Sequence, residues 1–137
     1  MSPIRILIAE DHAMLADALQ MLLSSQPDMH CVGVAPSGQE AVELAAHLQP
    51  DILLLDLGMP GLDGLGVMRE LQAAKSATRT LVVTARMDSG SVRAALALGA
   101  AGYLPKNESG SELLLYAAND AWAALRVFHA LQAPAAT

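Results

Sequence analysis

Ile4-Arg-Ile-Leu-Ile-Ala-Glu-Asp11 and Ile52-Leu-Leu-Leu-Asp56 decide the fold of this 137-residue chain. Each stretch is a short apolar run, interrupted in the first by Arg5 alone, and each ends in carboxylates. Short apolar runs without polar alternation are typical of strands covered on both faces, as in parallel sheets. Both stretches therefore predict buried strands with acidic side chains at their carboxyl ends.

Strand and helix patterns alternate along the rest of the chain. Three more strands are expected at 30–35, 80–84 and 103–104. Helices are expected at 15–22, from a Ser37 cap to Pro50, at 64–74, at 92–99, and from Ser111 onward. Five strands alternating with five helices over short connections predict an α/β fold, in which helices cover both faces of a parallel sheet.

Composition limits the class of protein. The length fits one domain, and 53% hydrophobic against 16% charged residues excludes a disordered chain. The uncharged stretch 94–105 contains two glycines and is shorter than the roughly 20 residues of a membrane span. The N-terminus lacks a signal-peptide pattern, and the single cysteine, Cys31, cannot form an internal disulfide, so a cytoplasmic protein is expected. A net charge of -6 argues against nucleic-acid binding by this chain.

Polar residues gather at the expected strand ends. Glu10, Asp11, Asp56 and Thr84 each end or follow a strand, and Lys106 follows the last one closely, so all five are expected at one edge of the sheet. Carboxylates 4 Å apart repel by about 1 kcal/mol in water and about 4 kcal/mol at an effective dielectric of 20. A divalent cation relieves this repulsion, and Mg²⁺ suits oxygen ligands. One carboxylate could then attack phosphorus, while a lysine and a hydroxyl hold the phosphoryl oxygens.

Several separated motifs resemble the receiver domain of bacterial two-component response regulators: Glu10-Asp11, Asp56-Leu-Gly-Met-Pro-Gly-Leu-Asp-Gly64, Thr84-Ala85 and Gly102-Tyr-Leu-Pro-Lys106. The resemblance covers residues 5–121 and is strongest to the NarL/LuxR-type subfamily. It implies a flavodoxin-like (βα)5 fold, a doubly wound five-stranded parallel sheet in the order 2-1-3-4-5. The receiver would occupy 3–122, and 123–137 would extend the last helix and form a tail.

The resemblance implies a role for each acidic residue. Asp56 matches the aspartate that accepts a phosphoryl group from the phosphohistidine of a sensor histidine kinase. Asp11 matches the direct ligand of Mg²⁺, and Glu10 matches an acid that reaches the ion through water. The backbone carbonyl of Gly58 would complete the metal shell.

Other positions match the parts of a phosphorylation switch. Thr84 and Lys106 would hold the phosphoryl oxygens, together with the backbone amides of Leu57 and Ala85. Tyr103 matches the aromatic residue that turns inward when Thr84 moves. The output would be a population shift in the face built from the fourth helix, fifth strand and fifth helix, which could also form a homodimer. The expected output is transcription regulation through a helix-turn-helix domain missing beyond Thr137.

The chain departs from the family pattern in two loops. Asn107 follows Lys106 where the family usually has a proline after a cis peptide bond. Gly58 replaces a larger, often polar residue and leaves the pocket open. A haloacid-dehalogenase-type phosphatase needs an acid two residues after its nucleophile, and Gly58 at that position argues against this class. A flavin or nucleotide carrier needs an anion site after the first strand, and the acidic Glu10-Asp11 argues against that class. A stand-alone relay shuttle or interaction module remains an alternative output.

Several residues carry a plain structural interpretation. His12 is interpreted as a helix-start neighbour and not a ligand, Asp63 as a turn residue, and Cys31 as a small buried hydrophobe. His30, His47 and His129 are interpreted as structural or surface residues. The last helix carries an apolar stripe at 114, 118, 121, 125 and 128, which is either a core face that frays or, slightly favoured, a dimer contact that includes Trp122.

Overall fold

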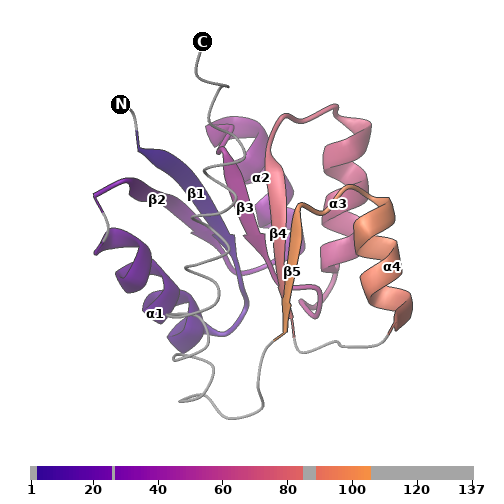
Figure 1. The fold of residues 1–137 in the computed structure, drawn as a ribbon, viewed down its shortest axis with the longest axis horizontal. Coiled ribbons are helices and arrows are strands. Elements are labelled where there is room, and N and C mark those ends of the chain that lie inside the picture. Colours follow the sequence, from indigo (N-terminus) through magenta and orange to yellow (C-terminus); the bar gives the residue numbers. More distant parts are fainter. Residues whose placement is uncertain (1–2, 26, 85–88, 106–137) are drawn as a thin grey trace.

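The computed structural model describes residues 3–25, 27–84 and 89–105, and its centre is a five-stranded parallel sheet. The strands are β1 (Ile4–Ala9), β2 (Met29–Ala35), β3 (Ile52–Leu55), β4 (Arg79–Thr84) and β5 (Gly102–Pro105). They lie in the order β2-β1-β3-β4-β5, and every neighbouring pair is parallel (Figure 1). This confirms the predicted fold class and strand order. Because strand order reverses between β1 and β3, the carboxyl ends of these two strands meet at the switch point of the sheet.

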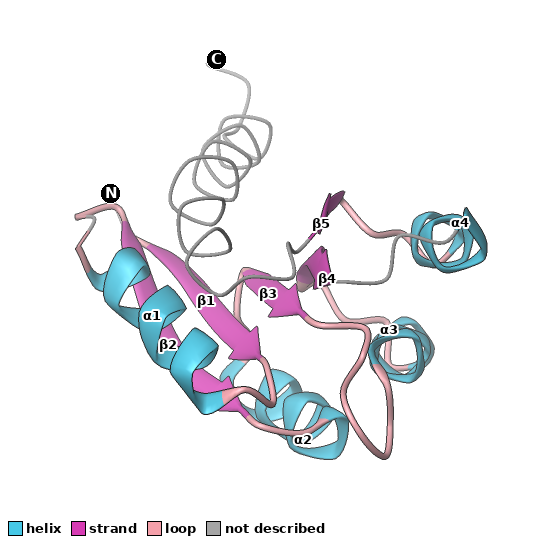
Figure 2. Ribbon diagram, turned by 90° about the horizontal axis from the view of Figure 1, so that it is seen from below, coloured by secondary structure: helices cyan, strands magenta, loops and turns pink. Residues whose placement is uncertain are grey.

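Four described helices connect the strands: α1 (Ala13–Ser24), α2 (Gly38–Leu48), α3 (Gly64–Ala73) and α4 (Ser89–Ala97). The sheet separates α1 from α2 and α3, and α4 lies beside α3 (Figure 2). The helix expected from Ser111 onward, with its apolar stripe, lies outside the described residues. Within the ranges that are described, none of the helices has the length and apolar character needed to cross a bilayer.

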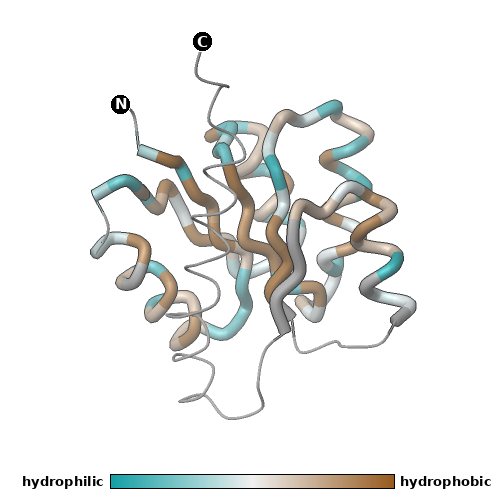
Figure 3. The backbone as a smooth tube through the Cα atoms, viewed as in Figure 1, coloured by the Kyte–Doolittle hydropathy of each residue, from teal (hydrophilic) through white to brown (hydrophobic). Residues whose placement is uncertain are grey.

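β1 is buried on both faces, which explains why its sequence does not alternate. Ile6 and Ile8 belong to a core that includes α1, whereas Leu7 and Ala9 belong to a second core that includes α2 and α3. Figure 3 shows the same pattern as hydrophobic strands between more polar helices. Fully burying an Ile or Leu side chain contributes about 1.5–3 kcal/mol. The packing of β1 therefore fixes the position of the residues that follow it.

Two helix starts follow their sequence signals in different ways. Ser37 caps α2 as predicted, and its Oγ accepts a hydrogen bond from the Glu40 backbone N–H at 3.2 Å. Asp63, predicted as a simple turn residue, caps α3, and its Oδ1 accepts from the Gly66 N–H at 2.9 Å. An aspartate cap satisfies an N–H that the first helical turn leaves free.

The helix expected at 92–99 is present as α4, but not every apolar residue in it faces the core. Ala95 is fully buried against the second core, while Leu96 is 54% exposed. Ala95 and the half-buried Leu98 are three residues apart, so they lie on the same side of α4 and face the core. Leu96 is rotated by about 100° from Ala95 and therefore points away from this side.

Candidate functional site

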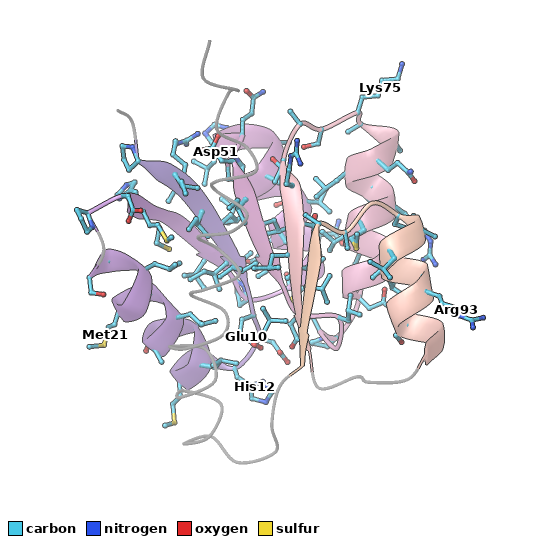
Figure 4. All side chains as sticks on the ribbon, viewed as in Figure 1. Glu10, His12, Met21, Asp51, Lys75 and Arg93 are labelled. Atoms are coloured by element: carbon cyan, nitrogen blue, oxygen red, sulfur yellow. The ribbon has the colours of Figure 1, made fainter. Side chains whose placement is uncertain are left out.

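Carboxylates from two adjacent strands meet at the carboxyl edge of the sheet. Glu10 directly follows β1 and Asp56 directly follows β3. The strands pair up to Ala9 and Leu55, and the Asp56 N–H donates to the Ala9 carbonyl at 3.1 Å, so the ladder carries both acids to the same place. Both are buried, Glu10 being 3% and Asp56 7% exposed. Figure 4 shows Glu10 at this edge, opposite Asp51 and Lys75.

Four side chains converge here. Glu10, Asp11, His12 and Asp56 each offer one ligand atom, and these atoms all lie within 4.8 Å of one another. Three carboxylates this close repel, most strongly where burial limits screening by water. Hard oxygen donors in this number are the ligands that a divalent cation such as Mg²⁺ prefers. The donor set therefore fits a bound divalent cation.

His12 belongs to this cluster, although its sequence position suggested only a helix start. It is the N-cap residue of α1, yet its side chain makes no capping hydrogen bond. Its Nδ1 lies 3.4 Å from Glu10 Oε2 and 3.5 Å from Asp11 Oδ1. One sequence signal could have indicated this: His12 directly follows Glu10-Asp11. The helix α1 begins at the next residue, so the chain turns here and His12 stays near the acidic edge of the sheet.

The loop after β3 is held close to Asp56. The Gly58 N–H donates to Asp56 Oδ1 at 3.0 Å, and the Gly64 N–H donates to the Leu57 carbonyl at 3.2 Å. A side chain at Gly64 would bring its Cβ within 2.6 Å of Leu57 Cα and 2.7 Å of the Asp56 carbonyl oxygen. Only glycine permits this approach, which ties the position of Asp56 to the start of α3.

Gly58 places no side chain over Asp56. Gly58 is exposed, and a Cβ there would meet nothing nearer than Asp56 Oδ1, at 3.6 Å. A larger side chain at position 58 would stand against the carboxylate.

Thr84 and Tyr103 are placed through their backbones. Thr84 ends β4, two positions beyond Val82, which pairs with Leu55 of β3, so Thr84 lies at the same edge as Asp56. Tyr103 pairs with Val82 from the other side. Ala85, Lys106 and the peptide bond between Lys106 and Asn107 lie outside the described residues. The roles expected of all these residues stay predictions.

Two other features lie away from this edge. A cavity of about 550 Å³ lies between α2 and α3, and its lining includes Asp51, Lys75 and Arg79. Figure 4 shows Asp51 and Lys75 at the edge of the sheet opposite Glu10. Cys31 is half-buried against the first core, and its thiol donates to the Gly33 carbonyl at 3.4 Å. Burial raises the pKa of this thiol, outweighing the hydrogen bond, so it is a poor source of a reactive thiolate.

Comparison with known proteins points to one family. The family model described as the response regulator receiver domain matches residues 6–118. The nitrate/nitrite response regulator NarL of Escherichia coli K12 is 39% identical over 112 residues, which are 82% of this chain and 52% of NarL. Protein-glutamate methylesterase/protein-glutamine glutaminase 5 of Myxococcus xanthus is 46% identical over 100 residues, 72% of this chain and 29% of that protein.

Solved structures agree with these matches. The response regulator domain of Thermotoga maritima CheB superposes with a TM-score of 0.83 at 32% identity, covering 91% of this chain and 95% of that domain. The chain thus spans about half of NarL and less than a third of the methylesterase, but nearly all of the isolated CheB domain.

Proposed function

The chain belongs to the response regulator receiver domain family, and from this premise we propose that it is a phosphoacceptor switch of a two-component system, phosphorylated on Asp56 by a sensor histidine kinase. The observation that carries the proposal is the placement of Asp56. Its carboxylate is buried at the end of β3 and lies within 4.8 Å of ligand atoms of Glu10 and Asp11.

Glu10, Asp11 and Asp56 would hold Mg²⁺, with the Gly58 carbonyl completing the protein ligands. Their oxygen donors and their mutual repulsion fit a hard divalent cation. When bound, the ion would supply positive charge beside Asp56, which offsets the repulsion between this carboxylate and an anionic phosphoryl donor.

Asp56 is the proposed nucleophile. One carboxylate oxygen forms a bond to phosphorus as the bond between phosphorus and the kinase histidine nitrogen breaks. The Gly58 N–H, which donates to Asp56 Oδ1, fixes the carboxylate in the loop. We assign the phosphoryl oxygens to the Thr84 hydroxyl, the Lys106 ammonium and the backbone amides of Leu57 and Ala85.

The protein is proposed as a signalling switch and not an enzyme with substrate turnover. A phosphatase of the haloacid-dehalogenase type needs a general acid two residues after its nucleophile, and Gly58 stands there. We propose that the phosphoryl group on Asp56 is lost slowly to water, and that the lack of a side chain at Gly58 leaves it less shielded.

The proposed output face consists of α4, β5 and the helix expected from Ser111. Thr84 in β4 and Tyr103 in β5 lie on neighbouring strands and would couple Asp56 to this face, which could also pair two copies of the chain. Residues 3–122 would form the receiver and 123–137 the extension of its last helix. As the resemblance to NarL/LuxR-type regulators implies, we propose a cytoplasmic transcription regulator, with DNA binding assigned to a helix-turn-helix domain. A stand-alone relay shuttle or interaction module is the alternative.

Intact mass spectrometry after incubation with acetyl phosphate and Mg²⁺ tests the proposal. We expect one added phosphoryl group, absent in Asp56→Asn and absent with EDTA. Asp51→Asn is the matched control, because Asp51 directly precedes β3 at the opposite edge of the sheet. Its carboxylate accepts from the Arg5 backbone N–H, far from the cluster, so this variant should be labelled like the original protein.

Two results would contradict the proposal. Labelling that persists in Asp56→Asn would place the phosphoryl group elsewhere. A folded protein that neither gains the group nor binds fluoroberyllate would instead favour an interaction module that does not take phosphate.

A further inference from the structure

The His12 imidazole is positioned like a ligand. Its Nδ1 lies at nearly equal distances, 3.4 and 3.5 Å, from Glu10 Oε2 and Asp11 Oδ1. Both distances are long for an N–H···O hydrogen bond, and one proton cannot serve two acceptors well. Figure 4 shows His12 directly beside Glu10 at the carboxyl edge. Its side chain is 75% exposed and makes no helix-capping bond, while its backbone N–H donates to Glu10 Oε2 at 3.3 Å, so its recorded polar contacts are with the carboxylates of this edge.

The spacing of the four ligand atoms fits a single ion. Ligands bind first-row divalent ions and Mg²⁺ at about 2.0–2.3 Å, so two ligands on opposite sides of one ion lie up to about 4.6 Å apart. Adjacent ligands lie about 3 Å apart on the same basis. The 4.8 Å spread of the cluster and its 3.4–3.5 Å nitrogen-to-oxygen distances are close to these values.

We propose that His12 is a metal-specificity residue, whose Nδ1 joins the carboxylates around late first-row ions such as Ni²⁺ and Co²⁺. This inference rests on the proposed function, since it concerns the same ion site. Carboxylates alone suit Mg²⁺, whereas imidazole suits Ni²⁺, Zn²⁺ and Cu²⁺. The neutral tautomer with its proton on Nε2 leaves the Nδ1 lone pair toward the carboxylates and the N–H toward solvent. A transition ion would therefore compete with Mg²⁺ where the phosphoryl group is transferred.

Isothermal titration of the full chain with Mg²⁺ and with Ni²⁺ tests the assignment. His12→Asn should weaken Ni²⁺ binding at least about tenfold, because loss of even an outer-shell partner of a ligand costs about 10- to 100-fold. It should change Mg²⁺ binding by less than about threefold, because Mg²⁺ prefers oxygen ligands. Asp11→Asn should weaken binding of both ions. His47→Asn, which removes an exposed histidine at the end of α2, should change neither.

Proton NMR of the Co²⁺-loaded protein gives a direct readout. We expect a hyperfine-shifted, exchangeable imidazole resonance that disappears in His12→Asn and persists in His47→Asn. If His12→Asn weakens Mg²⁺ and Ni²⁺ equally, or weakens neither, His12 does not select the metal and the proposal is wrong.

Failure here and failure of the proposed function are distinguishable. Acetyl phosphate labelling of the unmodified protein reports on Asp56 alone, whereas the ratio of the two metal affinities reports on His12.

Discussion

Replacing Gly64 by alanine should damage stability and phosphorylation together. The new Cβ would lie 2.6 Å from Leu57 Cα and 2.7 Å from the Asp56 carbonyl oxygen, where an ordinary contact needs about 3.4 Å. The backbone after β3 must therefore move by roughly 0.8 Å, since neither neighbour is the flexible end of a side chain. Such overpacking costs about 1–3 kcal/mol, and replacing glycine within a helix returns about 0.5–1 kcal/mol.

The expected net loss is at most about 2.5 kcal/mol of unfolding free energy and centres near about 1 kcal/mol, or roughly 4 °C in Tm for a domain of this size. The same displacement moves the nucleophile, and a misplacement near 1 Å can slow a reaction by about 100-fold. We therefore expect the initial rate of acetyl phosphate labelling to fall by about 10- to 100-fold.

Thermal unfolding followed by circular dichroism and labelling followed by intact mass would measure both effects. Gly33→Ala is the matched control, because a Cβ there meets only the side-chain ends of Leu48 and Leu7, at 3.4 Å. It should keep its Tm and labelling rate. If Gly64→Ala also keeps both, the loop adapts freely and the argument that α3 fixes Asp56 is refuted.

Three further predictions concern single side chains. Asp63→Ala should lower the unfolding free energy by about 0.5–2 kcal/mol in urea titration, because the Gly66 N–H loses its cap; the exposed Asp17→Ala should change it little. Gly58→Leu should lengthen the phosphoryl lifetime about two- to tenfold in a pulse-chase by mass, because the new side chain shields the phosphoryl group from water, and an unchanged lifetime would contradict this. The raised pKa of Cys31 means that the unfolded chain loses the thiol proton first, so stability should fall as pH rises above the thiol's unfolded pKa. Urea titrations across this pH range should show that decline, and Cys31→Ser should lack it.

The sheet could be predicted from sequence because its strands are short, apolar and punctuated. Ile52–Leu55 has no polar residue and ends at Asp56, so both the strand and the edge that carries the acid follow from local pattern. The expected meeting of Glu10, Asp11 and Asp56 needed one further step, the rule that strand order reverses at a switch point.

The missed features depend on contacts that pattern does not encode. An aspartate before glycine is typical of a turn, and the capping role of Asp63 depends on α3 beginning at the next residue. Leu96 fits a helical period, yet the direction in which α4 packs leaves it exposed and buries Ala95. The sequence places His12 directly after Glu10-Asp11 at a helix start, but it does not give the side-chain orientation that brings Nδ1 within 3.4 Å of Glu10 Oε2.

The pairing of β1 with β3 also bears on how the protein folds. Glu10 and Asp56 lie far apart in sequence, so the acids meet only after the chain has closed the loop that contains β2 and α2, against an entropy cost that grows with the logarithm of loop length. At that moment the cluster opposes its own assembly by charge repulsion. A divalent cation relieves this repulsion. It should speed folding if β1 and β3 pair before the transition state of folding, and slow unfolding if they pair after it. Stopped-flow kinetics with and without the ion would thus show when the two halves of the sheet join.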